Sequence, residues 1–165
     1  MRELFLTVVD RINRLLKVIV IICLVISLVA ITCQVLFRYI FHQPLSWTEE
    51  LSRYLMIWIT FLGASLAVRY QRLIKLEIIY MLISDRGKKW VLILAGFLSC
   101  FFYAILIVFG YLILDTVVMQ HSPALHISMA IPYAAIPVGG ILMLVNTIAS
   151  LIDPFPKTDQ GVDPL

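Results

Sequence analysis

The residues best suited to chemistry lie close together around position 50, where two adjacent acids, Glu49 and Glu50, are followed by Arg53. Acids in the first turn of a helix interact favourably with its dipole, and Glu49 and Arg53 lie one turn apart, so they can pair on one face. Arg38 closes the preceding apolar run and is placed to reach either acid across the loop. The cluster predicts an anchored helical hairpin and is a candidate contact surface for a partner.

The neighbours of these charges indicate a helix start at the same place. Ser46 or Thr48 is expected to cap the helix through its side-chain oxygen. Trp47 and Tyr54 are typical of the aromatic belt at a membrane surface. We therefore count Trp47 and Tyr54, with the charged residues, among the candidate partner-interface residues.

The other reactive side chains form no recognisable site. The three histidines, His42, His121 and His126, fall in or near predicted loops, and the last two are not spaced for ligation from one helix face. The cysteines lie in apolar runs without the spacing of a zinc site or a disulfide framework. No catalytic triad or glycine-rich phosphate loop occurs in a supporting context. The sequence thus predicts no enzyme, no metal site and no cofactor.

Composition places these residues in a membrane protein. Hydrophobic residues make up 62% of the chain and charged residues only 14%, whereas soluble domains are roughly 45–50% apolar. No basic cluster is interleaved with polar and aromatic residues, which argues against nucleic acid as a partner.

Four segments are expected to cross the bilayer as helices, at about 18–37, 51–68, 90–114 and 129–152. A hydrocarbon layer of about 30 Å requires about 20 helical residues, so the second segment is short unless the stem of Arg53 reaches up to the interface. In the last span, Pro132 fits the first helical turn and Pro137 is expected to kink the helix. The predicted fold is an all-α integral membrane protein.

Lysine and arginine are frequent before the first span and between the second and third, but rare in the other two loops. The positive-inside rule then places both termini in the cytoplasm. A basic cytoplasmic segment (1–17) is expected before the membrane domain (18–152), and a cytoplasmic tail (154–165) after it. The apolar stretch 73–83 is too short to cross, and we expect an interfacial helix there, with a re-entrant or partner-covered segment as the alternative.

The centres of the spans carry no charge, and no internal repeat is evident. Transport pathways need ionisable groups or interrupted repeat helices at that depth, so the chain is not expected to bind a transported solute itself. Gly63, Gly139 and Gly140 instead allow helices to approach closely. Whether they pack within the chain or against a partner is left open by the sequence.

Two separated patterns resemble a known family. Arg38, the stretch 47–54, Trp58 and the stretch 61–64 look like the signature of the small permease subunit of TRAP transporters, the DctQ type. The stretches 122–125, 131–133 (with Pro132) and 137–140 (with Gly139 and Gly140) are similar to the last-span pattern of that family. One departure is that Leu73 and Glu77 stand where relatives commonly have His and Asp.

The resemblance implies a tripartite ATP-independent periplasmic transporter in the bacterial inner (cytoplasmic) membrane. A large permease subunit of the DctM type would hold the substrate and sodium sites, and an extracytoplasmic solute-binding protein would deliver an organic acid to the outer face. This chain would scaffold the large subunit within the membrane lipid. The solute, whether a C4-dicarboxylate, sialic acid or another carboxylate, is not named by these residues.

Two alternatives compete with this interpretation. A self-sufficient small four-helix transporter would require an acid within its first span to couple protons, and the segment 18–37 contains none. A membrane assembly factor or enzyme acting at the outer loops would require a catalytic or recognition set that those loops do not contain.

Overall fold

The computed structural model describes residues 2–42, 45–70 and 85–152, and in this part of the chain all regular secondary structure is helical apart from one isolated bridge between His121 and Ser128. Its helices are α1 (Arg2–Ile40), α2 (Ser46–Arg69), α4 (Asp85–Val117), α5 (Ala130–Tyr133) and α6 (Ala135–Ile152). Four of the segments are long and apolar enough to cross a membrane, the fourth being α5 and α6 together. The predicted all-α fold with four spans is confirmed, whereas the segment 73–83 lies outside the described residues.

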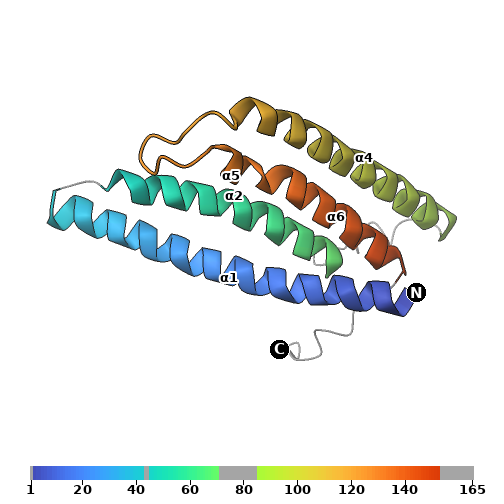
Figure 1. The fold of residues 1–165 in the computed structure, drawn as a ribbon. Helices are drawn as coiled ribbons and strands as arrows, with labels where there is room; N and C mark the ends of the chain where they lie inside the picture. The colour runs from blue at the N-terminus through green and yellow to red at the C-terminus, as the bar shows by residue number, and fades with distance from the viewer. Residues whose placement is uncertain (1, 43–44, 71–84, 153–165) are drawn as a thin grey trace, which may run out of the picture.

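The helices lie side by side in the order α1, α2, α6, α4, as Figure 1 shows. Helix α2 packs against both α1 and α6, and α4 packs against α5 and α6. The spans therefore form an open layer with α1 and α4 at its edges. Within the described residues, much of the apolar surface of α1 and α4 faces outward.

Helix α1 is much longer than a membrane crossing. Its 39 residues correspond to about 58 Å, nearly twice the hydrocarbon thickness of about 30 Å. From Arg2 onward, the expected basic segment 1–17 is continuous with the first span. Its first turns pack Leu6 and Val9 against Ala149 near the end of α6. At this end of the layer, which we call the terminal end, α1 contacts α6. The opposite end carries the loop between α4 and α5, and we call it the loop end.

The predicted interruption by proline occurs in the fourth span. Proline lacks an N–H, so Pro137 cannot donate to the carbonyl of Tyr133, and the helix is broken at Ala134 between α5 and α6. Bonds from Ala134 N to Ala130 O (2.8 Å) and from Val138 N to Ala134 O (3.2 Å) carry the chain across the break. Pro132 lies buried in the single turn of α5, as its expected place near the helix start requires.

The glycines of α6 explain how it fits between its neighbours. A Cβ added to Gly139 would lie 2.7 Å from Cβ of Phe61 on α2, and one added to Gly140 would lie 3.0 Å from Cγ1 of Ile107 on α4. Both glycines therefore serve packing within the chain. Gly63 differs, because a Cβ there would meet no other group within 4 Å in the part of the chain that the structure describes.

Candidate functional site

At the loop end, the carboxylate of Glu50 joins α2 to the loop between α4 and α5. Its Oε2 accepts hydrogen bonds from the backbone N–H groups of Ala124 (3.0 Å) and Leu125 (2.8 Å). Its Oε1 lies 3.1 Å from the hydroxyl of Tyr54 one turn further along α2. Bonds to an ionised acceptor are roughly twice as strong as neutral ones. Glu50, only 9% exposed, is therefore a structural anchor for this loop.

The anchored loop is braced by its own backbone. The N–H of Ser122 donates to Ile127 (2.9 Å), and the N–H of His126 donates back to the carbonyl of Ser122 (3.1 Å). His126 adopts a left-handed conformation with φ of 54°, which histidine tolerates better than most residues. The loop consequently has a defined backbone conformation where it binds Glu50.

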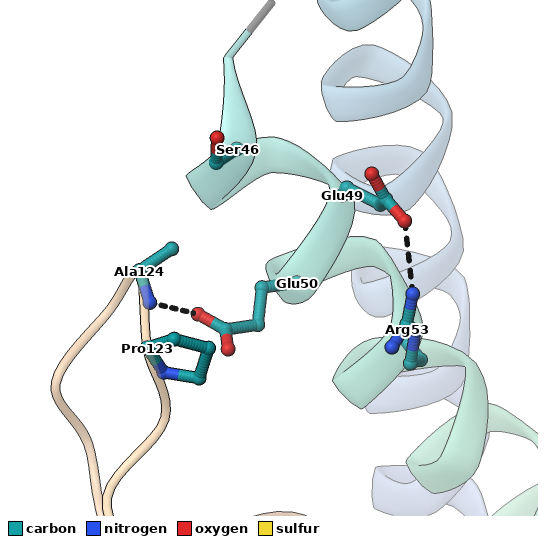
Figure 2. Close-up of a pocket in the computed structure, with 6 residues that line it drawn as sticks. All are labelled: Ser46, Glu49, Glu50, Arg53, Pro123 and Ala124. Carbon is teal, nitrogen blue, oxygen red and sulfur yellow. Dashed lines mark hydrogen bonds and ion pairs between the residues drawn. The ribbon is translucent and has the colours of Figure 1, made fainter.

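The second acid has a different role. Glu49 pairs with Arg53 at 2.9 Å, as the spacing predicted, and both side chains are more than half exposed. Figure 2 shows Glu50 turned toward the loop and Glu49 turned toward Arg53. Together with Ser46, Pro123 and Ala124, these three residues line a shallow pocket of about 390 Å³. An exposed pair of this kind contributes at most about 1 kcal/mol to stability, so it is available for other contacts.

Two expectations about this cluster are wrong. The N-cap of α2 is Leu45, and no side chain caps the helix. The Thr48 hydroxyl donates instead to the Leu45 carbonyl at 2.7 Å, a local bond that competes with capping. Arg38 is exposed in the last turn of α1 and pairs with neither acid among the described residues; Glu50 binds the loop and Glu49 binds Arg53 instead.

The two aromatic residues of this cluster, Trp47 and Tyr54, differ in their exposure. Trp47 is 46% exposed, as an interfacial side chain would be, whereas Tyr54 is buried. The hydroxyl of Tyr54 lies 3.3 Å from the sulfur of Met129, in addition to its contact with Glu50. Tyr54 thus supports the anchor from within rather than facing outward.

A second polar cluster, at the terminal end, was missed from the sequence. The guanidinium of Arg69, fully buried at the end of α2, donates to Oδ1 of Asp10 on α1 through Nη2 at 2.8 Å and Nε at 3.0 Å. Arg2 Nη2 donates to the Ile152 carbonyl at the end of α6, at 2.6 Å. These contacts hold the first turns of α1 against the ends of its neighbours.

One turn deeper, two amides form a reciprocal pair. Asn13 Nδ2 donates to Asn146 Oδ1 at 2.7 Å, and Asn146 Nδ2 donates to Asn13 Oδ1 at 2.9 Å. Asn146 Nδ2 also reaches the Ser65 carbonyl at 2.8 Å. All three residues are almost fully buried, so one polar contact joins α1, α2 and α6. A signal was present, because Asn146 interrupts an otherwise apolar span.

The two patterns of the earlier resemblance are therefore in contact, since Glu50 from the first binds Ala124 and Leu125 from the second. The sequence model of the family described as "Tripartite ATP-independent periplasmic transporters, DctQ component" matches residues 27–157. The chain belongs to this DctQ family. With four helices in the described part of the chain that are long and apolar enough to cross a membrane, this DctQ-family member is a multi-pass membrane protein.

Three relatives illustrate how the DctQ component occurs in proteins. The chain is 30% identical to the isethionate TRAP transporter permease protein DctMQ of Oleidesulfovibrio alaskensis over 73% of its own length, but over only 20% of that protein. It is 30% identical to the sialic acid TRAP transporter permease protein SiaT of Haemophilus influenzae over 70% of its length and 19% of the relative. It is also 26% identical to a protein of Haemophilus influenzae named as a TRAP transporter small permease, over 86% and 88% of the two chains. The chain thus spans about a fifth of the first two relatives and most of the third.

Proposed function

We propose that this chain is the small membrane subunit that scaffolds the large permease of a TRAP transporter, in sodium-coupled uptake of an organic acid delivered by a soluble binding protein. The single observation that carries the proposal is the open layer of helices. A large permease subunit of the DctM type would pack on that layer, while the substrate and sodium sites would lie in the large subunit.

The exposed surface of the layer supports this division of work. Phe97 is 71% exposed on α4, Leu28 is 62% exposed on α1, and Met56 is 59% exposed on α2. Lipid covers such side chains as readily as protein does, but four helices that close no bundle leave wide faces on which another helical protein can pack. Relatives in which the matched region forms only about a fifth of one long permease chain agree with such an attachment.

The polar groups of the described residues are placed for structure rather than for passage of an ion. Glu50 and the pair of Asn13 with Asn146 are bonded within the chain at the two ends of the layer. A solute pathway would need ionisable groups at mid-depth, facing the interior or a cavity. The arrangement therefore favours a partner subunit as the site of transport.

The charge distribution favours one orientation in the bacterial inner membrane. Arg2, Arg11, Arg14 and Lys17 belong to the terminal end, and the positive-inside rule would place that end, with both termini, in the cytoplasm. The loop anchored by Glu50 would then face the periplasm. Its pocket, lined by Glu49 and Arg53, would be available to the docked solute-binding protein.

Co-purification tests the scaffold directly. The tagged chain, extracted from membranes that also contain the large permease, is expected to retain that permease through gel filtration in mild detergent. A variant, Gly63→Leu, places bulk on a site where an added Cβ would meet none of the described residues within 4 Å, and it should lower the amount retained without unfolding the chain. Recovery of the folded chain without any large permease would contradict the proposal.

A further inference from the structure

One face of α1 carries basic groups whose surroundings are apolar. Arg11 and Arg14 lie one turn apart and Lys17 one turn beyond them, and all three are exposed. The side of α1 that packs on α2 and α6 is formed by other residues, namely Leu6, Val9, Asn13 and Leu16. Arg11 and Arg14 therefore point away from the layer, whereas Lys17, one turn beyond the buried Asn13, is exposed beside the contact.

The position of these basic residues along the membrane normal follows from the pair of Asn13 with Asn146. Asn13 lies level with Asn146 and with the Ser65 carbonyl. Beyond that level toward the terminal end, the apolar run of α2 continues to Val68 and that of α6 to Ile152. Arg14 and Lys17 lie on the other side, toward the membrane centre. Their helix positions are thus level with apolar parts of the neighbouring spans.

The charge on this face is not balanced by the described residues. Arg11, Arg14 and Lys17 form no ion pair within the described part of the chain, and the adjacent acid Asp10 is bound to Arg69. A cation near the hydrocarbon boundary is stabilised when its long side chain reaches a charged headgroup. The face consequently favours an anionic group at the level of Arg11 and Arg14.

Further along α1, toward the membrane centre, the same face is apolar and exposed. At 3.6 residues per turn, Val18, Ile21, Ile22 and Val25 follow beneath Arg11 and Arg14 on one side of the helix. Their exposed fractions are 49%, 53%, 52% and 52%. A ligand that fits must therefore have an anionic head and long apolar tails.

We propose that this face of α1 is a binding site for an anionic phospholipid of the leaflet at the terminal end. Arg11, Arg14 and Lys17 bind the phosphate of the headgroup, and the acyl chains lie along Val18, Ile21 and Val25. The contacts of Asp10 and Arg2 with α2 and α6 hold the helix rigid, so the site exists before the lipid arrives. This inference does not depend on the scaffold role, because it concerns the chain alone and is tested without a large permease.

Thermal unfolding of the purified full chain in a neutral detergent tests the site. We expect added phosphatidylglycerol to raise the melting temperature by a few degrees, and phosphatidylcholine or inorganic phosphate to raise it much less. The triple variant R11Q/R14Q/K17Q should lose the preference for phosphatidylglycerol. The matched control R11K/R14K/K17R, which keeps every charge, should retain it.

Three results would overturn the proposal. Equal stabilisation by phosphatidylcholine and phosphatidylglycerol would mean that the face contacts tails only, or that a protein covers it. Equal stabilisation by inorganic phosphate would mean a site for a soluble anion. Retention of the preference by the triple variant would place the site elsewhere. If the triple variant fails to fold, the single variant R14Q, read by native mass spectrometry, should show at least a severalfold loss of bound phosphatidylglycerol, and an unchanged amount would equally reject the site.

Discussion

Oε2 of Glu50 and the backbone nitrogen of Leu125 lie 2.8 Å apart, although 75 residues separate them in the chain. This bond fastens the beginning of the second span to the loop before the fourth, and Ala124 makes the same contact beside it. The loop before the fourth span is therefore fastened directly to α2. A soluble partner that docks there would meet a prearranged surface, which reduces the ordering cost of binding.

Replacing this anchor should loosen the loop. Glu50→Ala removes the acceptor of two backbone N–H groups, and we expect it to lower the free energy of unfolding by about 1–3 kcal/mol. Hydrogen exchange at the Ala124 and Leu125 amides should accelerate. Glu49→Ala is the control, because its exposed pair with Arg53 is worth at most about 1 kcal/mol. Equal exchange rates in the two variants would show that Glu50 does not hold the loop.

The contact between α1 and α2 at the terminal end should weaken when a single acid is removed. Asp10→Ala removes a charged acceptor of the buried Arg69 guanidinium, and a loss of about 1.5–3 kcal/mol in unfolding free energy is expected. Glu3→Ala, an exposed acid on the same helix, should change it little. Chemical unfolding followed by the tryptophan signal measures both variants, and similar small effects would argue against the importance of this contact.

The amide pair between α1 and α6 is suited to a double-mutant cycle. Asn13→Leu and Asn146→Leu each leave the other amide without its reciprocal partner. We expect each single variant to destabilise the chain and the double variant to cost less than the sum, with a coupling of about 0.5–2 kcal/mol. Strict additivity would mean that the pair contributes nothing beyond its separate members.

The effect of alanine on stability should differ between Gly139 and Gly63, because their surroundings differ. Gly139→Ala brings a Cβ within 2.7 Å of Phe61, so we expect a loss of about 1–3 kcal/mol from overpacking. Gly63→Ala meets open space and should be neutral or stabilise the helix by up to about 1 kcal/mol. Melting temperatures of the isolated variants compare them, and the assignment of Gly139 to internal packing fails if it tolerates alanine as well as Gly63 does.

The features that could be predicted from the sequence are those with a local cause. The four spans follow from runs long enough to cross the bilayer, the break before Pro137 follows from a missing N–H, and the pair of Glu49 with Arg53 follows from helical spacing. Contacts with a partner distant in the chain could not be predicted. The Glu50 carboxylate was expected to interact with Arg38 across a short loop, but backbone groups 74 and 75 residues away bind it instead.

The polar contacts at the terminal end could not be predicted for a similar reason. Arg69 counts toward the positive-inside pattern, and nothing near it in sequence indicates that it is buried against Asp10, 59 residues away. The N-cap could not be predicted either. It is Leu45, because the Thr48 hydroxyl donates to the Leu45 carbonyl instead of capping the helix. Long-range hydrogen bonds depend on how the helices pack, and a single sequence does not specify that packing.

Uptake by reconstituted vesicles tests the scaffold role most directly. Vesicles with a sodium gradient would hold this chain alone, the large permease alone, or both, and would receive the organic acid carried by the cognate binding protein. We expect uptake only when both subunits are present. Uptake by this chain alone, or full uptake by the large permease without it, would contradict the scaffold role.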